Sequence, residues 1–337
     1  MPATAPSKTR KIGNDAVTAI GYGAMGIAAF YGAIQPDEER LAVLDALYER
    51  GCTNWDTSNI YGDSEVLLGK WFKKTGKRSE IFLATKCGIT GDPQRPVNGE
   101  PEYVKQCMQK SLERLGVDSV DLYYLHRPDP TVPIEKTVGA MAELVKEGKA
   151  RYLGLSECTA SGIRRAHAVH PIAAIQVEYS LFELGVESAQ TDILRTAREL
   201  GIAVVAYSPL GRGLLTGQYK SPDDFEPGDF RRTVPRYSKE NFPKILELVD
   251  TVGAIGKKYG ATPGQVALAW LLAQGEDIIP IPGTRKIKYL EENLGALDLK
   301  LEEEDVHAIR TLCDNLELGD RYDAGRMKLI MQDTPPL

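Results

Sequence analysis

The alternation of short β-type runs with amphipathic helical patterns constrains this chain more than any other feature of its sequence. Eight runs rich in apolar and β-branched residues are separated by roughly 20 to 40 residues, the length that a βα unit needs. Alternating βα units predict a parallel sheet, and eight of them favour a closed (β/α)8 barrel, the TIM-barrel fold, over an open doubly wound sheet. The expected strands are residues 19–23, 53–56, 81–86, 120–126, 150–155, 173–177, 203–207 and 278–281.

The helical patterns between these strands agree with such a barrel. Residues 37–50, 102–115 and 134–147 each place apolar side chains at helical spacing on one face. Gly116 and Gly148 follow the last two patterns, and glycine is the residue that most often ends a helix. Because α/β barrels often exceed ~250 residues as one unit, we expect residues 1–337 to form a single domain.

Three segments do not fit plain repetition. Residues 10–18 contain Gly13, Asn14 and Asp15 at their centre and predict an N-terminal β-hairpin that closes the bottom of the barrel. Residues 208–243 form a long Gly-, Pro- and Arg-rich loop after the seventh strand, and a loop of that length is usually functional. Residues 316–337 form a C-terminal tail, which we expect to lie over the barrel mouth.

Composition excludes several classes of protein. The chain has 42% hydrophobic and 26% charged residues and a formal charge of −6, which is typical of a globular protein and does not indicate a nucleic-acid surface. Five scattered cysteines without CxxC spacing favour a reducing compartment, and four histidines without HxH or HExxH spacing argue against a metal centre. Because residues 1–11 are polar and no apolar run approaches ~18 residues, we expect a cytoplasmic protein without a membrane partner. No feature specifies an oligomeric state.

Titratable residues end three consecutive expected strands. Asp56, Lys86 and His126 occupy these positions, and Tyr61 follows Asp56 by five residues. In a parallel barrel the carboxyl ends of the strands meet at one mouth, where active sites lie. Charged groups at the ends of apolar strands are costly to desolvate without partners, so we expect these residues to share one site.

This combination suits proton transfer. A tyrosine has a pKa of ~10, and a nearby ammonium would lower it; a change of ~2 units needs ~2.7 kcal/mol of differential interaction. We therefore expect Lys86, held by Asp56, to lower the pKa of Tyr61, while His126 orients a carbonyl oxygen. Taken singly, Asp56 is an ordinary turn residue and Tyr61 an ordinary half-buried aromatic, so the prediction depends on the four occurring together.

A glycine-rich motif at residues 21–26 (GYGAMG) offers a different interpretation. It matches the G-x-G-x-x-G fingerprint of dinucleotide-binding open sheets. That fingerprint requires a helix to open at once, whereas the next helical pattern begins only near Asp37. We therefore assign the motif to the first βα loop of the barrel.

Taken together, the motifs of this chain resemble those of the aldo-keto reductase superfamily. The resemblance is carried, in order, by residues 21–26 (GYGAMG), 56–62 (DTSNIYG), 85–86 (TK), 121–126 (DLYYLH), 154–156 (GLS), 176–179 (QVEY), 206–211 (AYSPLG) and 281–284 (IPGT). The details, including 211–213 (GRG) and 289–293 (YLEEN), are most similar to the branch of pyridoxal reductases and plant perakine reductase. The resemblance implies NADPH-dependent reduction of aldehydes or ketones, with Tyr61 as general acid supported by Asp56, Lys86 and His126.

The resemblance also implies the cofactor-binding residues. Hydroxyls and backbone N–H groups in a tight turn suit phosphate oxygens, a flat aromatic ring suits stacking, and basic side chains at a helix start favour a 2′-phosphate. The nicotinamide side would comprise Gly23, Met25, Asp56, Ser156, Gln176 and Tyr207; the pyrophosphate side Ser208, Pro209, Leu210, Gly211 and Gly213; and the adenosine side Gly283, Thr284, Arg285, Lys286, Glu292 and Asn293.

Two positions depart from this pattern. Glu157 stands where many relatives have an asparagine after the cofactor serine, and an ionised carboxylate cannot donate a hydrogen bond to the carboxamide. Tyr289 stands where many relatives have an arginine for the 2′-phosphate. The expected preference for NADPH then depends on Arg285 and Lys286.

The expected substrate is a small carbonyl compound. Tyr22, Phe30, Tyr31 and Arg127 are expected to line the mouth, together with the tail near Tyr322. This aromatic rim suggests aryl or heteroaryl aldehydes such as pyridoxal or benzaldehydes, and Arg127 either meets a substrate anion or pairs with Asp129. The alternatives are an NADPH-binding sensor or scaffold, as the resemblance to potassium-channel β subunits allows, and a metal-dependent hydrolase.

Overall fold

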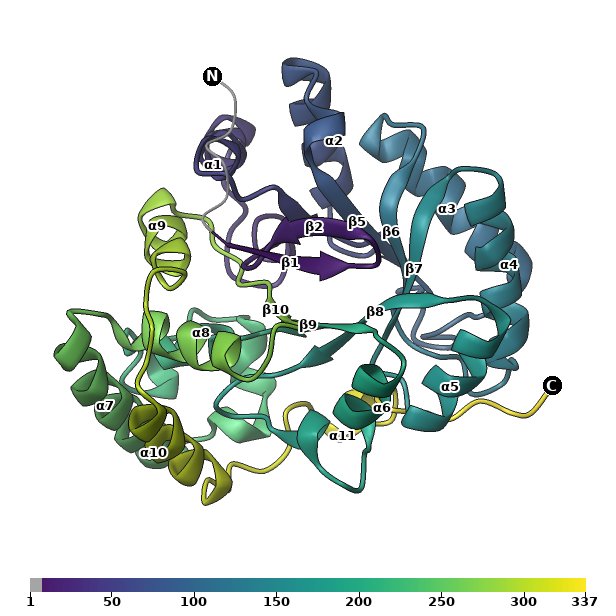
Figure 1. Cartoon of the computed structure of the whole chain (residues 1–337). Helices are drawn as coiled ribbons and strands as arrows, with labels where there is room; N and C mark the ends of the chain where they lie inside the picture. Colours follow the sequence, from purple (N-terminus) through teal and green to yellow (C-terminus); the bar gives the residue numbers. More distant parts are fainter. Residues whose placement is uncertain (1–7) are drawn as a thin grey trace.

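The eight parallel strands close into a barrel in which every strand pairs with its neighbours in the chain. The computed structural model describes residues 8–337; residues 1–7, part of the polar N-terminal stretch, lie outside the described residues. Strand order runs from β3 to β10 without a crossover. The seam is closed by the Gly21 N–H, which donates to the Pro280 carbonyl at 2.9 Å, and by the Gly23 N–H, which donates to the Pro282 carbonyl at 3.3 Å. Figure 1 shows the ring of strands with helices around it.

The strands have the predicted number and order, with ends that differ by a few residues. Gly23 lies where the seam is tightest, because a Cβ there would approach the Ile281 carbonyl oxygen to 2.7 Å. The strands are β3 (Tyr22–Gly23), β4 (Asn54–Asp56), β5 (Phe82–Cys87), β6 (Val120–Leu125), β7 (Ala150–Ser156), β8 (Ile172–Glu178), β9 (Ala203–Tyr207) and β10 (Ile278–Pro280).

Helices cover the outside of the barrel. Gly76, Gly116 and Gly260 end three of them in the left-handed conformation. Thr262 and Gln265 form a capping box at the start of another. The helices are α1 (Asp37–Glu49), α2 (Ser64–Thr75), α3 (Pro101–Leu115), α4 (Ile134–Lys146), α5 (Ala160–Val169), α6 (Ile193–Glu199), α7 (Phe242–Tyr259), α8 (Pro263–Ala273), α9 (Ile287–Gly295), α10 (Glu303–Asp314) and α11 (Ala324–Met327).

The predicted hairpin closes one end of the barrel. Strands β1 (Thr9–Ile12) and β2 (Asp15–Thr18) pair antiparallel, and Figure 1 shows them lying across the ring of strands. Ile12 and Val17 join the apolar cluster inside the barrel, which includes Leu122 and Ile279. The prediction of an N-terminal hairpin at the barrel bottom is therefore confirmed.

Arg10 fastens this hairpin to the barrel wall. Its side chain is buried, and its guanidinium donates to the carbonyls of Leu272, at 2.7 Å, Gly275 and Ile278. These carbonyls lie at the end of α8 and the start of β10. One charged side chain therefore satisfies several main-chain acceptors that would otherwise be buried without partners.

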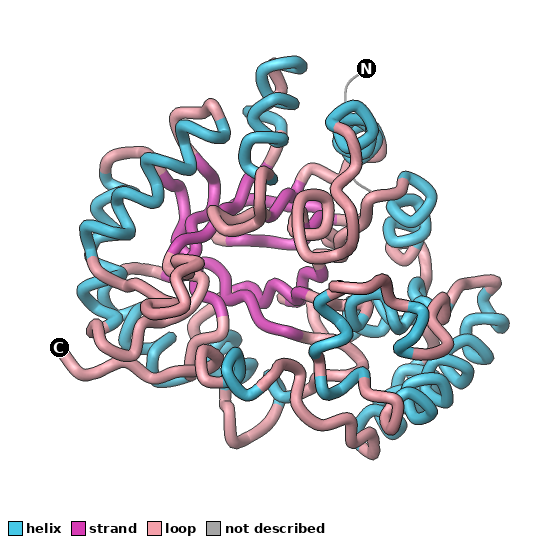
Figure 2. The backbone as a smooth tube through the Cα atoms, turned by 180° about the vertical axis from the view of Figure 1, so that it is seen from behind, coloured by secondary structure: helices cyan, strands magenta, loops and turns pink. Residues whose placement is uncertain are grey.

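The opposite end of the barrel is covered by loops and the tail, as Figure 2 shows from behind. Between β9 and α7 the long loop contains four short 3₁₀ turns, at Gly211–Thr216, Pro222–Asp224, Phe230–Thr233 and Pro235–Tyr237. The tail passes the end of β7, where Cys158 pairs with Gln332 in an isolated bridge. Within residues 8–337, no helix has both the length and the apolar character needed to cross a membrane.

Replacing Arg10 tests the closure of the barrel bottom. Arg10→Met should lower the free energy of unfolding by about 2 to 4 kcal/mol, because buried carbonyls lose a charged donor. Urea denaturation measures this loss. The matched control Lys11→Met removes an exposed cation of the same strand and should change stability by less than about 0.5 kcal/mol. Equal losses in the two variants would contradict the role given to Arg10.

Candidate active site

A buried ion pair lies at the carboxyl ends of β4 and β5. Parallel pairing sets Asp56 opposite Ala84, which brings the next inward residue of β5, Lys86, beside the carboxylate. Lys86 is fully buried, and its ammonium pairs with Asp56 Oδ1 and donates to the Thr57 carbonyl at 2.8 Å. The other oxygen, Oδ2, accepts from Gln176 Nε2 at 2.8 Å. The two charges thus satisfy each other and the nearby polar groups, as burial requires.

Tyr61 and His126 lie over this pair. The Tyr61 ring centroid is 5.0 Å from the Lys86 Nζ atom and 5.7 Å from the centroid of the His126 ring, which it meets edge to face at 86°. Gly62 has φ of 53°, and a Cβ there would approach the Ala28 carbonyl oxygen to 2.6 Å, so the turn after Tyr61 requires glycine. The structure therefore brings the four expected catalytic residues together.

His126 is held in the neutral form. Burial lowers its pKa well below the usual value, and the nearby Arg127 and Lys86 cations lower it further. Its Nδ1 atom lies 3.2 Å from the Ser58 hydroxyl. When that hydroxyl donates to Nδ1, the ring proton is on Nε2, where a carbonyl oxygen could accept it.

The pKa of Tyr61 moves in the direction opposite to our expectation. Burial raises it, the Asp56 carboxylate raises it further, and the Arg127 guanidinium opposes these effects. Burial likewise raises the pKa of Asp56 and lowers that of Lys86, while the ion pair between them opposes both changes. The prediction of a lowered phenol pKa is therefore wrong for this structure. The phenol stays protonated, which is the state that a proton donor requires.

Three of the expected nicotinamide residues lie on the same rim. Ser156 and Gln176 are paired in the register of β7 and β8, and Tyr207 ends β9 beside Glu178. The Ser156 hydroxyl accepts from Arg127 Nη1 at 3.0 Å, and Gln176 bonds Asp56. Gln176 thus links the catalytic pair to the expected cofactor side.

The loop after β9 begins with a run of left-handed residues. Ser208, Gly211, Arg212 and Gly213 have φ of 50°, 54°, 56° and 94°. At Gly211 a Cβ would approach the Phe182 ring to 2.4 Å, and the Gly211 carbonyl accepts from the Tyr237 hydroxyl at 3.1 Å. The Gly211 and Gly213 N–H groups donate to the Ser208 and Leu210 carbonyls, at 2.9 and 3.0 Å, and so stabilise the turn itself. Pro209 and Leu210 lie within the same turn.

The expected adenosine residues lie around the seam and the start of α9. The Lys286 N–H donates to the Thr284 hydroxyl at 3.1 Å, and Arg285 Nη1 donates to the Ala33 carbonyl at 2.8 Å. Gly283 packs against the Gly23 carbonyl oxygen, where a Cβ would come within 2.6 Å.

Farther along α9, Glu292 accepts from the Thr262 hydroxyl at 2.7 Å, and Asn293 is buried. Tyr289, which departs from the resembled pattern, donates to Gln218 Oε1 at 3.1 Å. Its ring lies 5.8 Å from the Lys286 ammonium and 6.0 Å from the Lys288 ammonium. Lys286 and Lys288 therefore keep positive charge at the start of this helix, although position 289 is not an arginine.

The expected substrate residues divide into buried and exposed groups. Tyr22 is buried and donates to the Thr284 carbonyl at 2.9 Å, whereas Phe30 is 45% exposed with φ of 72°. Tyr31 lies over the Arg231 guanidinium at 5.3 Å. Arg127 donates to Ser156 and to the His126 carbonyl, at 2.6 Å, rather than to Asp129. Met25 accepts main-chain hydrogen bonds from Ala28 and Ala29 within the first βα loop.

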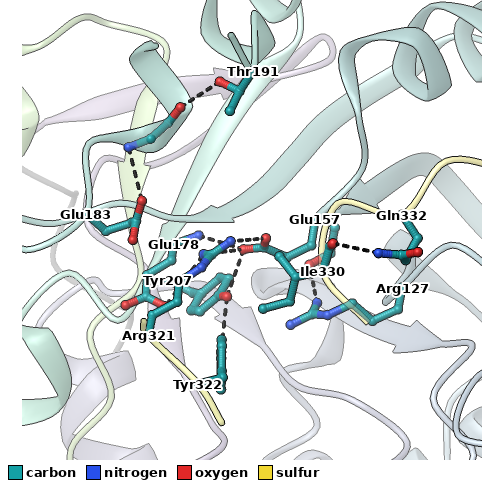
Figure 3. A network of polar contacts seen from close by, with 12 residues as sticks. Arg127, Glu157, Glu178, Glu183, Thr191, Tyr207, Arg321, Tyr322, Ile330 and Gln332 are labelled. Atoms are coloured by element: carbon teal, nitrogen blue, oxygen red, sulfur yellow. Dashed lines mark hydrogen bonds and ion pairs between the residues drawn. The ribbon is translucent and has the colours of Figure 1, made fainter. Parts of the chain in front are cut away.

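Glu157 is a residue whose contacts the sequence did not reveal. Its side chain is fully buried and bonds Tyr207 and Arg321, as Figure 3 shows. Arg321 comes from the tail, 164 positions later in the chain. A contact of that separation has no periodicity or motif in the sequence that could have predicted it.

The described residues contain no cluster of three His, Cys, Asp or Glu side chains arranged to hold a metal ion. The local chemistry of the site is that of a buried ion pair, a protonated phenol and a neutral imidazole. These groups can donate protons and hydrogen bonds to an oxygen atom that gains negative charge.

Comparison with known proteins decides the family. The sequence profile of the aldo/keto reductase family matches residues 19–314. The chain belongs to the aldo/keto reductase family. It is 62% identical to aldo-keto reductase str7 of Strobilurus tenacellus over 338 aligned positions, covering 98% of this chain and 99% of the relative. It is 53% identical to aldo-keto reductase yakc of Schizosaccharomyces pombe, whose name includes NADP(+), covering 98% of each chain.

Solved structures of the family share the fold. A thermostable aldo-keto reductase, Tm1743, determined with the inhibitor epalrestat, has 29% identity and a TM-score of 0.74 over 90% of this chain and 99% of its own. The glycerol dehydrogenase AKR11B4 of Gluconobacter oxydans has 28% identity and a TM-score of 0.82 over 92% of this chain and 96% of its own. These likenesses agree with an oxidoreductase built on an α/β barrel and with the resemblance to the superfamily.

Removing the Lys86 ammonium tests the buried pair. Lys86→Met leaves the Asp56 carboxylate without its counter-charge, and the free energy of unfolding should fall by about 3 to 5 kcal/mol. The variant's Asp56 pKa lies above its unfolded value, so its stability is highest near pH 4 and falls as pH rises through that raised pKa. Chemical denaturation between pH 4 and 8 measures both effects.

Lys70→Met is the matched control. Lys70 pairs with Asp37 on the surface, with 51% of its side chain exposed. Its loss should cost at most about 1 kcal/mol and should not add a new pH dependence above pH 5. A Lys86→Met variant as stable as this control would show that the buried pair does not hold the site together.

Proposed function

We propose that this protein is an NADPH-dependent aldo-keto reductase that converts aldehydes or ketones to alcohols. The observation that carries the proposal is the placement of a protonated phenol, Tyr61, beside a neutral imidazole, His126, and above the buried Asp56–Lys86 pair. Ser156, Gln176 and Tyr207 lie at the ends of neighbouring strands on the same rim. A hydride donor and a proton donor can therefore reach one carbonyl group.

The chain's residues suit NADPH. The Ser208 hydroxyl, at the start of the turn that ends at Gly213, would donate a hydrogen bond to a pyrophosphate oxygen, and Arg285 and Lys286 offer positive charge for a 2′-phosphate. Ser156 and Gln176 would hold the carboxamide, and Tyr207 would stack on the nicotinamide ring. The bound cofactor supplies the hydride that a carbonyl carbon accepts. The NADP(+) in the name of the yeast relative supports this choice.

The remaining chemistry is that of the protein. As the carbonyl carbon is reduced, its oxygen gains negative charge and becomes a far stronger base than the phenolate of Tyr61. Tyr61 then gives up its proton, and the buried Lys86 ammonium stabilises the phenolate that remains. His126 stays neutral and donates a hydrogen bond to the same oxygen. Asp56 keeps Lys86 in place and balances its charge.

The proposed substrates are aryl or heteroaryl aldehydes, such as pyridoxal or benzaldehydes, within the branch of pyridoxal and perakine reductases. Aromatic side chains around the mouth, including Phe30, Tyr31 and Tyr322, support this class because flat rings stack favourably. A panel of aldehydes assayed by NADPH oxidation tests the proposal. Tight NADPH binding with negligible turnover across the panel would instead indicate a cofactor sensor or scaffold.

Replacing Tyr61 by phenylalanine tests the proposed proton donor. Tyr61→Phe should lower kcat by about 10² to 10⁴ because general acid catalysis is lost. Affinity for NADPH, measured by fluorescence titration, should stay almost unchanged. Tyr152→Phe is the control, because this tyrosine contacts Asn14 of the hairpin at the other end of the barrel. A small loss of kcat in Tyr61→Phe would mean that another group supplies the proton.

Replacing Arg127 tests whether the substrate carries a negative charge. Arg127→Ala should raise KM for carboxylated benzaldehydes by about 10-fold or more and leave KM for neutral benzaldehydes within about 3-fold, because one charged contact is lost. Initial rates with both series measure the difference. Equal changes in the two series would indicate that Arg127 acts through Ser156 and the main chain instead of contacting a substrate anion.

A further inference from the structure

We propose that Glu157 is a positioning residue that couples the C-terminal tail to the orientation of Tyr207. The inference rests on the proposed function, because Tyr207 is the residue proposed to stack on the nicotinamide. Its evidence is a set of contacts that join the ends of β7, β8 and β9 to the C-terminal tail, where Arg321 lies 164 positions after Glu157. The residues of this junction are drawn in Figure 3.

Every oxygen of the Glu157 carboxylate has a partner. Oε1 accepts from the Tyr207 hydroxyl at 2.8 Å, from Arg321 Nη1 at 3.0 Å and from the Glu178 N–H at 3.1 Å. Oε2 accepts from Arg321 Nη2 at 2.6 Å. The forked guanidinium and the carboxylate thus pair through two bonds, which fixes direction as well as distance.

The main chain of Glu157 holds the tail as well. Its carbonyl accepts from the Met331 N–H at 3.1 Å, and its own N–H donates to the Gln176 carbonyl at 3.0 Å. The residue has φ of 50°, a conformation that an L side chain rarely adopts. This conformation turns the side chain toward Tyr207 and Arg321 directly after β7 ends. A rare backbone conformation at such a junction is consistent with a positional role.

The contact with Tyr207 is made through the hydroxyl alone. That hydroxyl bonds Glu157 and lies 3.2 Å from the hydroxyl of Tyr322, the residue next to Arg321 in the tail. A ring held at its hydroxyl has the direction of its long axis fixed, and its flat faces take no part in this tether. The tail and Glu157 together therefore set the position of the ring on which a nicotinamide would stack.

Further buried charges reinforce the junction. Glu178, at the end of β8, has guanidinium groups of Arg212, Arg236 and Arg321 between 3.5 and 3.6 Å from its carboxylate oxygens. Arg321 therefore lies between two buried carboxylates. Its removal would leave both with less counter-charge, so the tail is docked by an interaction that tolerates little displacement.

Variants can break the two sides of the junction separately. Tyr207→Phe removes the hydroxyl tether, and Arg321→Met removes the guanidinium that joins the tail to Glu157 and Glu178. Glu157→Gln removes the negative charge between them. Hydrogen exchange in the chain without cofactor measures the tail directly. We expect Tyr207→Phe to speed exchange of the Met331 amide by about 3-fold or more, although residue 207 does not touch residue 331, because both act on Glu157.

The same junction predicts an effect on the reaction. Arg321 contacts none of the four catalytic residues. Arg321→Met should slow hydride transfer by about 10-fold and raise the primary isotope effect with deuterated NADPH, because the Tyr207 ring is displaced. The Tyr207→Phe and Arg321→Met effects should not add in the double variant, because they act through one carboxylate.

Arg326→Met is the matched control. It removes another arginine of the tail, whose guanidinium pairs with Asp323 at the surface, and should leave exchange at Met331 and the isotope effect unchanged. Additive effects of Tyr207→Phe and Arg321→Met in the double variant would overturn the coupling. It would also be overturned if both variants lowered the melting temperature but kept the wild-type isotope effect and the wild-type exchange rate at Met331. Aldehyde turnover by the wild-type protein tests the proposed function separately. If the wild-type protein does not reduce aldehydes, the proposed function fails, but hydrogen exchange at Met331 still tests the coupling.

Discussion

Burial of the Lys86 ammonium at the end of a barrel strand is the constraint on which the rest of the site depends. A charge without contact with water is tolerated only when a counter-charge and hydrogen-bond acceptors surround it. Asp56 supplies the counter-charge, the Thr57 carbonyl supplies an acceptor, and Gln176 satisfies the second oxygen of Asp56. The ion pair therefore fixes β4, β5 and β8 relative to one another at the barrel mouth.

The barrel places the other proposed catalytic residues around the Asp56–Lys86 pair. Parallel strands deliver Asp56, Lys86 and His126 to one end, and the glycine turn after Tyr61 brings the phenol over them. Burial then keeps the phenol protonated and the imidazole neutral. A carbonyl compound entering this mouth would meet a hydrogen-bond donor and a proton donor beside a stabilising cation, which is the arrangement that the proposed reduction requires.

The sequence predicted those parts of the molecule that local pattern determines. Strand number and order, the glycine helix caps, the hairpin at residues 10–18 and the common location of Asp56, Lys86 and His126 all follow from periodicity and from the geometry of parallel strands. The direction of the Tyr61 pKa did not follow, because it depends on how deeply the loop packs. The Glu157–Arg321 contact also escaped prediction, since it depends on where the tail docks.

The pH dependence of kcat/KM for NADPH-dependent aldehyde reduction tests the central claim most directly. If Tyr61 donates the proton and His126 stays neutral, kcat/KM should stay level from about pH 6 to 8 and fall only in the alkaline range, where the phenol begins to lose its proton. A decline through a pKa near ~6.5 would mean that a histidinium supplies the proton. That result would contradict the roles proposed for Tyr61 as the proton donor and for His126 as a neutral hydrogen-bond donor.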